Sequence, residues 1–263
     1  MSTPRPIQSV TTLDLYERWA EVYDTDGNIL QAIDDLLLPD LLSQALPLLP
    51  SDGSITITEL GCGTGRNTVK LLLLPGPKIS TINALDLSPQ MLDIARGRCE
   101  AILSKATEGV GVRFHVFNAL NTTIPTEVSQ LKAQADLVLS TLVLEHLPVA
   151  TFFKACASFL QPGGILIVTN MHAEMGRRSQ AGFMDTDGVT KVQGESFNYE
   201  TEEVFEVGRR FGFVVVGEGG MWERGIGEED IASEVVGGRG AKWVGCKVWF
   251  GGVFRFSGIG DVE

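Results

Sequence analysis

A turn containing three glycines is the stretch of this sequence best suited to hold a ligand. Residues 59–65 read Glu-Leu-Gly-Cys-Gly-Thr-Gly; they end a β-rich run at residues 54–60 and precede a helical stretch without glycine or proline at residues 66–74. Glycine permits positive φ angles and lets the backbone approach a ligand without an intervening Cβ. The N-terminus of the following helix offers unpaired N–H groups and a positive dipole end. The turn therefore predicts a site for the carboxylate or phosphate of a cofactor.

An acidic residue at the end of the second predicted strand narrows the choice of cofactor. Asp86 lies 21 residues after Gly65 and directly follows a strand at residues 80–85. At about this spacing in nucleotide-binding sheets, an acidic side chain accepts hydrogen bonds from the hydroxyls of a bound ribose. Glycine-rich turns alone also serve NAD and nucleoside triphosphates. The turn and Asp86 together favour a cofactor that contains adenosine.

Two histidines follow later strands and are the candidate catalytic residues. His146 follows the fourth predicted strand, and His172 follows the fifth. Imidazole titrates near neutral pH and could remove a proton from a substrate. Either ring could instead cap a helix or pack in the core, and nearby Glu174 could be a solvated loop carboxylate. Both histidines are therefore candidate general bases with a structural alternative.

Aromatic and apolar residues outside the predicted sheet are the candidates for substrate binding. Tyr16 and Trp19 share one face of a predicted N-terminal helix with Tyr23. A helix placed before a complete sheet can serve as a lid, although an aromatic stripe at helical spacing also fits a core face. Phe183 and Met184 are apolar residues within a polar loop, which indicates substrate contact. The predicted substrate-binding set is Tyr16, Trp19, Phe183 and Met184.

The elements that must position these residues alternate along the chain. Strands are predicted at residues 54–60, 80–85, 112–117, 135–139 and 165–169, and helices at residues 66–74, 89–104 and 151–160. This alternation predicts an α/β fold with a doubly wound, parallel sheet. The ligand crevice of such a sheet lies beyond the carboxyl ends of its strands, where the glycine turn, Asp86 and the segment before His146 are all placed.

The segments that flank this core are less regular. The predicted divisions are a flexible tail (1–11) and a single domain (12–263), made of a helical lid segment (12–50), a cofactor-binding core (54–170) and an acceptor-side region (171–263). Residues 171–197 are expected to be a long binding loop, and the glycine-rich residues 217–240 a mobile loop. The run at residues 242–256 is predicted to be a final strand, or a hairpin that turns at Gly251-Gly252.

Composition limits the partners of this chain. It has 263 residues, a formal net charge of -12 and a pI of about 4.7. Such an acidic chain lacks the basic face that a nucleic-acid-binding protein needs. No run approaches the ~20 apolar residues of a membrane span, and the first ten residues have no apolar core of signal-peptide type. We therefore expect a soluble protein that binds neither nucleic acid nor membrane.

The four cysteines predict a reducing compartment. Cys62, Cys99, Cys156 and Cys246 each lie in an apolar or glycine-rich segment and have no metal-ligand spacing. Buried free thiols are the ordinary state of such residues. Because a reducing interior keeps thiols free, we expect a cytoplasmic protein. No close cluster of His, Asp or Glu predicts a metal site.

Four short motifs, in this order along the chain, resemble the signatures of a known enzyme family. They are the glycine turn at 59–65, Leu-Asp-Leu-Ser-Pro-Gln-Met-Leu at 85–92, Leu-Glu-His-Leu-Pro at 144–148 and Leu-Gln-Pro-Gly-Gly at 160–164. Together they resemble the class I S-adenosylmethionine-dependent methyltransferases over residues 12–216. The resemblance implies a Rossmann-like, mostly parallel seven-stranded sheet with an N-terminal helical lid, S-adenosyl-L-methionine as the cofactor, and metal-independent transfer.

The resemblance also implies roles for individual residues. The glycine turn, oriented by Glu59, would pass close to the methionyl part of the cofactor. Asp86 would bind the ribose hydroxyls, and Leu87 would contact the adenine. Asn118 would meet the adenine amino group; many relatives have Asp here, and an amide oxygen can accept the same hydrogen bond. Tyr23 would close over the cofactor. The full predicted cofactor-binding set is Tyr23, Glu59, Gly61, Cys62, Gly63, Gly65, Asp86, Leu87, Asn118, Ala119 and Ser140.

The resulting hypothesis is transfer of a methyl group to O, N or C of a small, mainly apolar acceptor, such as a secondary metabolite. Two alternatives stay open. An NAD-dependent oxidoreductase would show the fingerprint G-x-G-x-x-G, whereas here Arg66 directly follows G-x-G-x-G. A repurposed or non-catalytic member of the fold would bind the cofactor without transferring its methyl group. The acceptor, its nucleophilic atom and the oligomeric state do not follow from the sequence.

Overall fold

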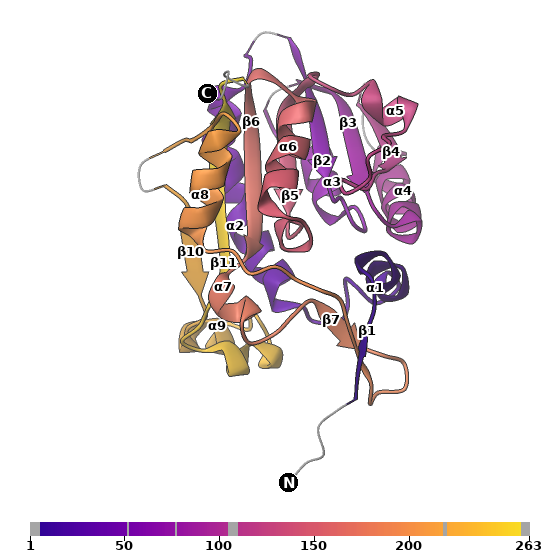
Figure 1. Cartoon of the computed structure of the whole chain (residues 1–263), viewed down its shortest axis with the longest axis vertical. Helices are drawn as coiled ribbons and strands as arrows, with labels where there is room; N and C mark the ends of the chain where they lie inside the picture. Colours follow the sequence, from indigo (N-terminus) through magenta and orange to yellow (C-terminus); the bar gives the residue numbers. More distant parts are fainter. Residues whose placement is uncertain (1–5, 52, 77, 105–109, 218–219, 259–263) are drawn as a thin grey trace.

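A sheet with helices on both faces forms the centre of the molecule (Figure 1). The structure is a computed structural model that describes residues 6–51, 53–76, 78–104, 110–217 and 220–258. The strand order of the main sheet is β10-β11-β6-β5-β2-β3-β4, and β9 also pairs with β11. These strands are β2 (Ser54–Leu60), β3 (Lys78–Asp86), β4 (Gly111–Val116), β5 (Ala135–Thr141), β6 (Leu160–Met171), β9 (Phe213–Val215), β10 (Trp222–Gly225) and β11 (Lys247–Phe256).

The pairing confirms the predicted doubly wound, mostly parallel sheet. Strands β2 to β6 pair in parallel with their neighbours, and β11 runs antiparallel to β6. Both β9 and β10 pair with β11 on the edge that β6 leaves free. Two short strands therefore share the last position, and the sheet has eight strands where the resemblance implies seven.

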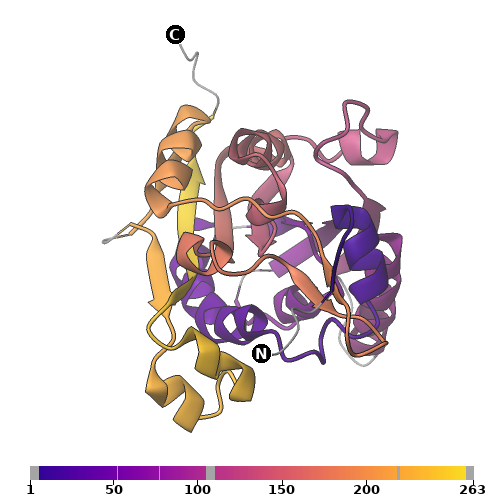
Figure 2. The same cartoon turned by 60° about the horizontal axis from the view of Figure 1, so that its bottom comes forward.

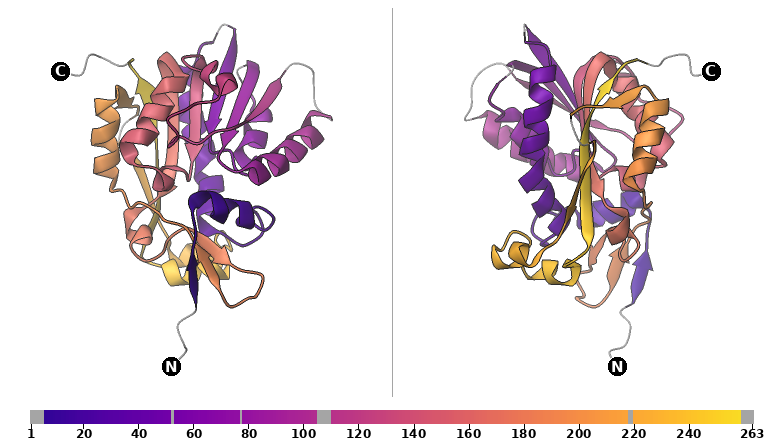
Figure 3. Two further views of the ribbon diagram at one scale, coloured as in Figure 1. Left: turned by 45° about the vertical axis from the view of Figure 1, so that its right-hand side comes forward. Right: turned by 90° about the vertical axis from the view of Figure 1, so that its left-hand side faces the viewer.

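Each face of the sheet has its own layer of helices, as Figure 3 shows. One face is covered by α2 (Ile29–Ala45), α3 (Arg66–Leu72) and α4 (Pro89–Leu103), and the other by α6 (Val149–Phe159), α8 (Thr201–Arg210) and the short α5 (Thr126–Ser129). In β5, Leu137 and Leu139 pack into the first layer while Val138 packs into the second. Because both faces are covered, β5 and β6 contain continuous apolar runs at residues 137–139 and 165–168, whereas β2 alternates Ile with Thr over residues 55–58.

Residues 12–28, here called the lid, lie at the carboxyl edge of the sheet (Figure 1), whereas the rest of the predicted lid segment (12–50) includes α2, which packs on a face of the sheet. Helix α1 (Thr12–Trp19) begins after Thr11, whose side chain accepts from the N–H of Asp14. Residues 7–9 are not a flexible tail, because β1 (Ile7–Ser9) pairs in parallel with β8 (Lys191–Gln193). The remainder of the predicted tail, residues 1–5, lies outside the described residues.

The predicted binding loop at residues 171–197 also has regular structure. It contains α7 (Ala173–Gly176), β7 (Gly182–Met184) and β8, and β7 and β8 pair antiparallel to complete a three-stranded sheet with β1. Figure 2 shows this small sheet beside α1. Three-residue strands are too short for sequence periodicity to show, and the parallel pairing joins segments more than 180 residues apart along the chain.

The C-terminal region corrects two expectations. Residues 217–240 are not one mobile loop: outside residues 218–219, they contain β10, α9 (Glu228–Ala232) and the first half of the 3-10 helix η3 (Gly238–Trp243). Gly251 and Gly252 do not form a hairpin, because both lie inside the single strand β11. A side chain at Gly251 would overlap the ring of Trp249 and press on Leu41 of α2. Glycine is needed here for packing rather than for a turn.

Candidate active site

The glycine turn is fastened to the neighbouring strand and to the helix that follows it. The N–H groups of Gly61 and Cys62 donate to the carbonyl oxygen of Leu85 at the end of β3, over 2.7 and 2.9 Å. Behind the turn, the Thr68 hydroxyl of α3 donates to the buried Glu59 carboxyl over 2.5 Å. Glu59 thus holds the first turn of α3 against the end of β2, which fixes the geometry of the turn between them.

The three glycines of the turn meet different steric demands. Gly61, Gly63 and Gly65 have φ angles of 76°, 53° and 79°, a region that residues with a side chain rarely adopt. A Cβ at Gly61 would overlap Val143, and one at Gly65 would lie 3.0 Å from Ala95 of α4. A Cβ at Gly63 would enter open space in front of the turn. The outer glycines allow close packing, and Gly63 keeps a cavity open.

Asp86 is held in place at the floor of that cavity. Its Oδ2 accepts from the N–H of Gly63 over 2.8 Å, and its Oδ1 accepts from the N–H of Ser88 over 2.9 Å. Ser88 in turn caps α4, accepting from the N–H of Met91. Burial raises the pKa of the Asp86 carboxyl to about 6, while the backbone hydrogen bonds from Ser88 and Gly63 oppose that rise. The carboxyl is therefore mainly ionised at neutral pH, and each oxygen has a further lone pair available.

The first of two adjoining cavities, here called the strand-end cavity, opens in front of Asp86. It has about 760 Å³ of free space including its solvent-filled mouth. Leu87, Phe117, Asn118 and Ala119 are among the residues that line it. The Asn118 Oδ1 accepts from the N–H of Leu120 over 2.9 Å, which fixes the amide plane. The other residues that line this cavity are Thr12, Tyr16, Tyr23, Leu60, Gly61, Gly63, Met91, Leu120, Thr141, Leu142, Val143, His146 and Leu147.

Four residues of the predicted cofactor-binding set lie behind this lining. Glu59 and Gly65 support the turn as described above. The Cys62 side chain packs with Ala84 and Leu92. The fully buried Ser140 hydroxyl donates to the carbonyl oxygen of Leu60 over 2.9 Å, and so joins β5 to β2. The structure gives these residues supporting positions, whereas Tyr23, Gly61, Gly63, Asp86, Leu87, Asn118 and Ala119 line the cavity.

Polar contacts at two points join the lid to the edge of the sheet. The Ser88 hydroxyl donates to Glu17 of α1 over 2.5 Å. In the turn after α1, Asp24 accepts from the Thr64 hydroxyl of the glycine turn over 2.9 Å and from Arg98 of α4 over 2.5 Å. These contacts hold Tyr16, the neighbour of Glu17, and Tyr23, the neighbour of Asp24, over the strand-end cavity.

Tyr16, Glu145 and His146 form a cluster between the lid and the sheet. Glu145 and His146 belong to the short helix η2 (Leu144–His146) that follows β5. The Tyr16 Oη lies 2.7 Å from the His146 Nε2, and the Glu145 Oε1 lies 3.6 Å from the same nitrogen. The Glu145 Oε2 also accepts from the N–H of Met171 over 3.3 Å. Three groups that can hold or pass a proton therefore meet at one point.

Burial determines the proton positions in this cluster. It lowers the pKa of His146 to about 4 against the opposing backbone of Glu195, and it raises the pKa of the Tyr16 hydroxyl well above its usual range. The imidazole is therefore neutral, and in the tautomer with its proton on Nδ1 its Nε2 accepts from the Tyr16 hydroxyl. Burial also raises the pKa of Glu145 to about 7, with the Met171 hydrogen bond acting in the opposite direction. Glu145 changes its charge near neutral pH, within reach of the imidazole.

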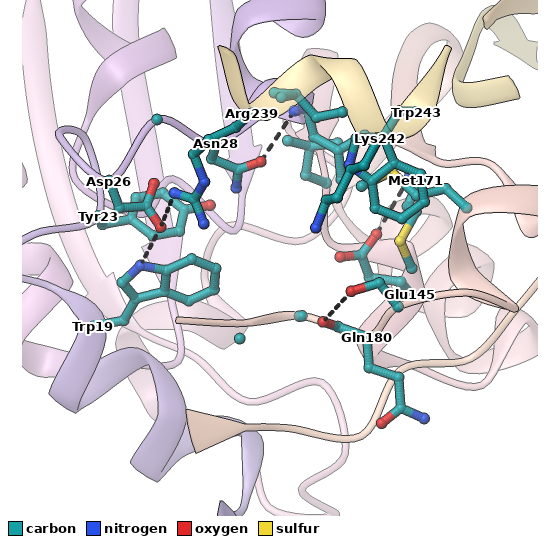
Figure 4. A pocket seen from close by; sticks show the side chains of 18 of the residues that line it. Trp19, Tyr23, Asp26, Asn28, Glu145, Met171, Gln180, Arg239, Lys242 and Trp243 are labelled. Atoms are coloured by element: carbon teal, nitrogen blue, oxygen red, sulfur yellow. Dashed lines mark hydrogen bonds and ion pairs between the residues drawn. The ribbon is translucent and has the colours of Figure 1, made fainter. Parts of the chain in front are cut away.

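A second cavity, here called the lid cavity, adjoins the strand-end cavity, and Figure 4 shows residues that line it. It has about 720 Å³ of free space including its mouth, and it shares Tyr16, Tyr23 and Leu142 with the strand-end cavity. Figure 4 shows Trp19 and Trp243 on opposite sides. The other residues that line it are Asp26, Gly27, Asn28, Ile29, Leu30, Glu145, Met171, Met175, Ser179, Gln180, Ala181, Gly182, Arg239 and Lys242.

Three predicted residues lie outside both cavities. His172 caps α7, since its Nδ1 accepts from the N–H of Glu174 over 3.1 Å, and its Nε2 lies 3.2 Å from Glu223 of β10. Phe183 is buried in the small sheet, where it stacks on Trp19 with ring centroids 5.5 Å apart. Met184 follows it in β7. His172 and Phe183 therefore support the walls of the site, and they do not face its space.

Several lining residues were not among the sequence candidates. Glu145 stands beside His146 in the Leu-Glu-His-Leu-Pro motif, so the motif contained a signal for it. No sequence signal indicated Arg239, Lys242 or Trp243. They lie in η3, within a glycine-rich stretch whose position depends on contacts with the lid. Within the described residues, no group of three or more His, Cys, Asp or Glu side chains is arranged to hold a metal ion.

Two further findings concern cysteines and helices. All four cysteines are free and buried, as predicted. In the part of the chain that the structure describes, no helix is both long and apolar enough to cross a membrane.

The buried Glu59 predicts a stability that depends on pH. Burial raises its pKa to about 8, against the opposing hydrogen bond from Thr68. Between the ordinary carboxyl pKa and this value, only the unfolded chain ionises, so the free energy of unfolding falls as pH rises, by up to about 1.4 kcal/mol per pH unit. Urea unfolding from pH 5 to 8 should show a shallower fall for Glu59→Gln than for wild type. The exposed Glu21→Gln variant should retain the wild-type slope, and equal slopes for wild type and Glu59→Gln would contradict the assignment.

Comparison with known proteins agrees with this geometry. Residues 58–168 match the family model described as a methyltransferase domain. An uncharacterized methyltransferase of Emericella nidulans is 40% identical over 264 residues, which covers 93% of this chain and 91% of the relative.

Two solved structures share the fold. An S-adenosylmethionine-dependent methyltransferase from Mesorhizobium loti has a TM-score of 0.56 at 18% identity, covering 83% of this chain and 97% of that one. Magnesium protoporphyrin IX methyltransferase from Synechocystis, with bound S-adenosylhomocysteine, has a TM-score of 0.56 at 13% identity, covering 92% and 96%. At these low sequence identities, the two similarities show a shared fold only.

Proposed function

Because this chain belongs to the class I S-adenosylmethionine-dependent methyltransferases, and S-adenosylmethionine is its cofactor, we propose that it methylates a small molecule bound in the lid cavity. The observation that carries this proposal is the pair of adjoining cavities. One has the glycine turn and Asp86, the other has aromatic walls, and Tyr16 lies between them. Family membership also decides against the dehydrogenase alternative.

The strand-end cavity fits the cofactor on observations from this chain. Asp86 presents an ionised, fixed carboxylate with free lone pairs to ribose hydroxyls. The open space in front of Gly63 leaves room for the methionyl part beside backbone. Leu87 and Phe117 would flank the adenine, and Asn118 would meet its polar edge. When bound, S-adenosylmethionine supplies an activated methyl group on its sulfonium sulfur, so the protein's remaining tasks are alignment, water exclusion and proton removal.

The Tyr16–His146 pair would perform the proton removal. Tyr16 faces both cavities, so its hydroxyl can accept the proton of an acceptor O–H or N–H while passing its own proton to the His146 Nε2, 2.7 Å away. Glu145, 3.6 Å from that nitrogen, would stabilise the imidazolium that forms. General base catalysis of this kind contributes roughly 10²–10⁴-fold in rate. The lid, held by its polar contacts with the sheet edge, would exclude water from the site of methyl transfer.

The form of the lid cavity supports a small acceptor over a macromolecular one. Its walls come from the lid, the 171–197 segment and η3, which together enclose the space around Tyr16. The net charge of -12 opposes close approach of nucleic acid. Trp19, Tyr23 and Trp243 give the lining an aromatic character that suits an apolar or planar acceptor. The four free thiols support a cytoplasmic location.

Two glycine substitutions should separate folding from cofactor binding. Gly65→Ala combines a positive φ with contact at 3.0 Å to Ala95, and should reduce the free energy of unfolding by roughly 2–4 kcal/mol. Gly63→Ala meets no atoms and should cost only about 1–2 kcal/mol, but its methyl group would enter the cofactor space and weaken S-adenosylhomocysteine binding. Urea unfolding and calorimetric titration would measure the two effects. Equal stability losses, or unchanged affinity in Gly63→Ala, would contradict this assignment.

The proposed function is tested by titration followed by a transfer assay. Wild-type protein should bind S-adenosylhomocysteine with micromolar affinity and show no comparable binding of NAD. Incubation with methyl-labelled S-adenosylmethionine and a panel of small aromatic acids, phenols and amines should then place label in a small-molecule product. Binding without transfer to any small molecule in the panel would favour the repurposed or non-catalytic alternative. Label recovered in protein or RNA would contradict a small-molecule acceptor.

A further inference from the structure

The lid cavity has a cationic wall, and we propose that this wall recognises a carboxylate on the acceptor, at the end away from the atom that is methylated. This inference rests on the proposed function, since it specifies the acceptor of the same site. Its residues are Arg239 and Lys242 of η3, with Trp19 and Trp243 as the walls that an aromatic body would contact. Figure 4 shows the Arg239 and Lys242 side chains along one edge of the cavity, across from Gln180.

The local backbone places both cations on the same side. Residues three apart eclipse one another in a 3-10 helix, and Arg239 and Lys242 are three apart within η3. The helix is held from behind by Trp243, which is buried in the main core. It is also held at Gly240, where a side chain would overlap Val236 of the α9–η3 connection. The two cationic groups are thus presented by a fixed element rather than by a free loop.

Contacts with the lid orient the Arg239 guanidinium. Its Nη1 lies 4.0 Å from the Asp26 Oδ2, and its Cδ packs over Gly27. That Asp26 oxygen already accepts from the Trp19 indole N–H over 3.0 Å. The Arg239 side chain is nevertheless 55% exposed. A guanidinium with one long ion pair and half its surface open retains donors that match a carboxylate in a bidentate arrangement.

Lys242 adds a second positive charge beside an aromatic face. Its Nζ lies 4.9 Å from the centroid of the Trp243 ring, and its charge acts on Lys191 of β8, whose pKa burial and Lys242 both lower. A carboxylate bound beside Arg239 and Lys242 in the lid cavity would be attracted by both charges.

Other residues that line the cavity have a different character. Glu145 and Tyr16 also line it, and Glu145, whose pKa burial raises to about 7, contributes a neutral or negative charge. A carboxylate would be repelled from Glu145 and attracted to Arg239 and Lys242. The charge distribution therefore orients an aromatic acid with its carboxylate at η3 and its nucleophilic group at Tyr16. A single carboxylate suits the site better than a phosphate dianion, because Asp26 already offsets part of the positive charge.

The test compares acids with their uncharged amides. Protein saturated with S-adenosylhomocysteine would be titrated with 4-hydroxybenzoate, 4-hydroxycinnamate and indole-3-acetate, and with the primary amide of each, using the fluorescence of the cavity tryptophans and calorimetry. At least one acid should bind about tenfold or more tightly than its amide, as a charge-assisted pair predicts. Arg239→Gln and Lys242→Gln should each remove most of that preference. Arg209→Gln, a matched loss of charge on exposed α8, should retain it.

Three outcomes would overturn the inference. They are binding of none of the acids, equal binding of acids and amides by wild type, and a preference that survives both substitutions. A fall in S-adenosylhomocysteine affinity in Arg239→Gln or Lys242→Gln would also overturn it, because the cations would then serve the cofactor carboxylate. Failure of the proposed function is distinguishable: wild type would then bind no S-adenosylhomocysteine or transfer no methyl group to any acceptor, whether charged or neutral.

Discussion

Replacing Asp86 with alanine is expected to lower the affinity for S-adenosylhomocysteine by about 100-fold or more. Hydrogen bonds to a charged group contribute roughly 1.5–3 kcal/mol each, and the ribose offers two hydroxyls. The substitution also releases the N–H groups of Gly63 and Ser88, which Asp86 holds at 2.8 and 2.9 Å. The measurement is calorimetric titration, with circular dichroism to establish that the variant is folded.

Two further variants sharpen this prediction. Asp86→Asn keeps one acceptor oxygen but removes the charge, so its loss of affinity should be intermediate. Asp93→Ala removes an exposed carboxylate that pairs with Arg96 of the same helix, and it should bind as wild type does. If a folded Asp86→Ala bound S-adenosylhomocysteine with unchanged affinity, the assignment of Asp86 to the ribose would be wrong.

Replacing His146 with glutamine or Tyr16 with phenylalanine is expected to lower kcat by roughly 10²–10³-fold, the range for loss of a general base. Binding of S-adenosylhomocysteine should change far less, because neither side chain is assigned to the cofactor's polar groups. The two side chains act as one unit across a 2.7 Å hydrogen bond, so the double variant should be little slower than either single one. His115→Gln, a histidine of β4 outside both cavities, is the matched control.

The pH dependence separates the roles of Glu145 and His146. The pKa of His146 is lowered to about 4 by burial, so the imidazole is neutral throughout the neutral range and its titration does not shape the rate there. The pKa of Glu145 is raised to about 7 by burial, and only its ionised form stabilises an imidazolium. The rate should therefore rise with pH through about 7, and Glu145→Gln should remove this rise. Additive losses in the Tyr16–His146 double variant, or wild-type turnover without His146, would contradict the proton relay.

The core of the fold could be predicted because its signals are local. The central strands are short β-rich or apolar runs bounded by turn residues, and strands alternate with helices along the chain. The glycine turn and Asp86 follow from the rule that ligands bind beyond the carboxyl ends of such strands. The structure places both at one cavity. Asn118 is found there for the same reason, because it lies just beyond the end of β4.

The acceptor side could not be predicted because its signals are distant in sequence. Strand β1 is three residues long and pairs with β8, which lies more than 180 residues later in the sequence. Trp243 and Lys242 reach the lid cavity only because η3 packs next to the lid, and no periodicity in a glycine-rich segment shows that contact. His172 and Ser140, by contrast, were predicted as site residues, but they do not line either cavity. Both are at strand ends, as predicted, but their side chains turn to a helix cap and to the neighbouring strand.

The crystal structure of the S-adenosylhomocysteine complex would test the central claim most directly. It should show the ribose hydroxyls on the Asp86 carboxylate and the homocysteine part beside Gly61 and Gly63. The sulfur should face the Tyr16 hydroxyl, so that a methyl group on it would point into the lid cavity. Binding of the ligand outside the strand-end cavity, or a sulfur that faces away from Tyr16 and the lid cavity, would contradict the proposed arrangement of cofactor and acceptor.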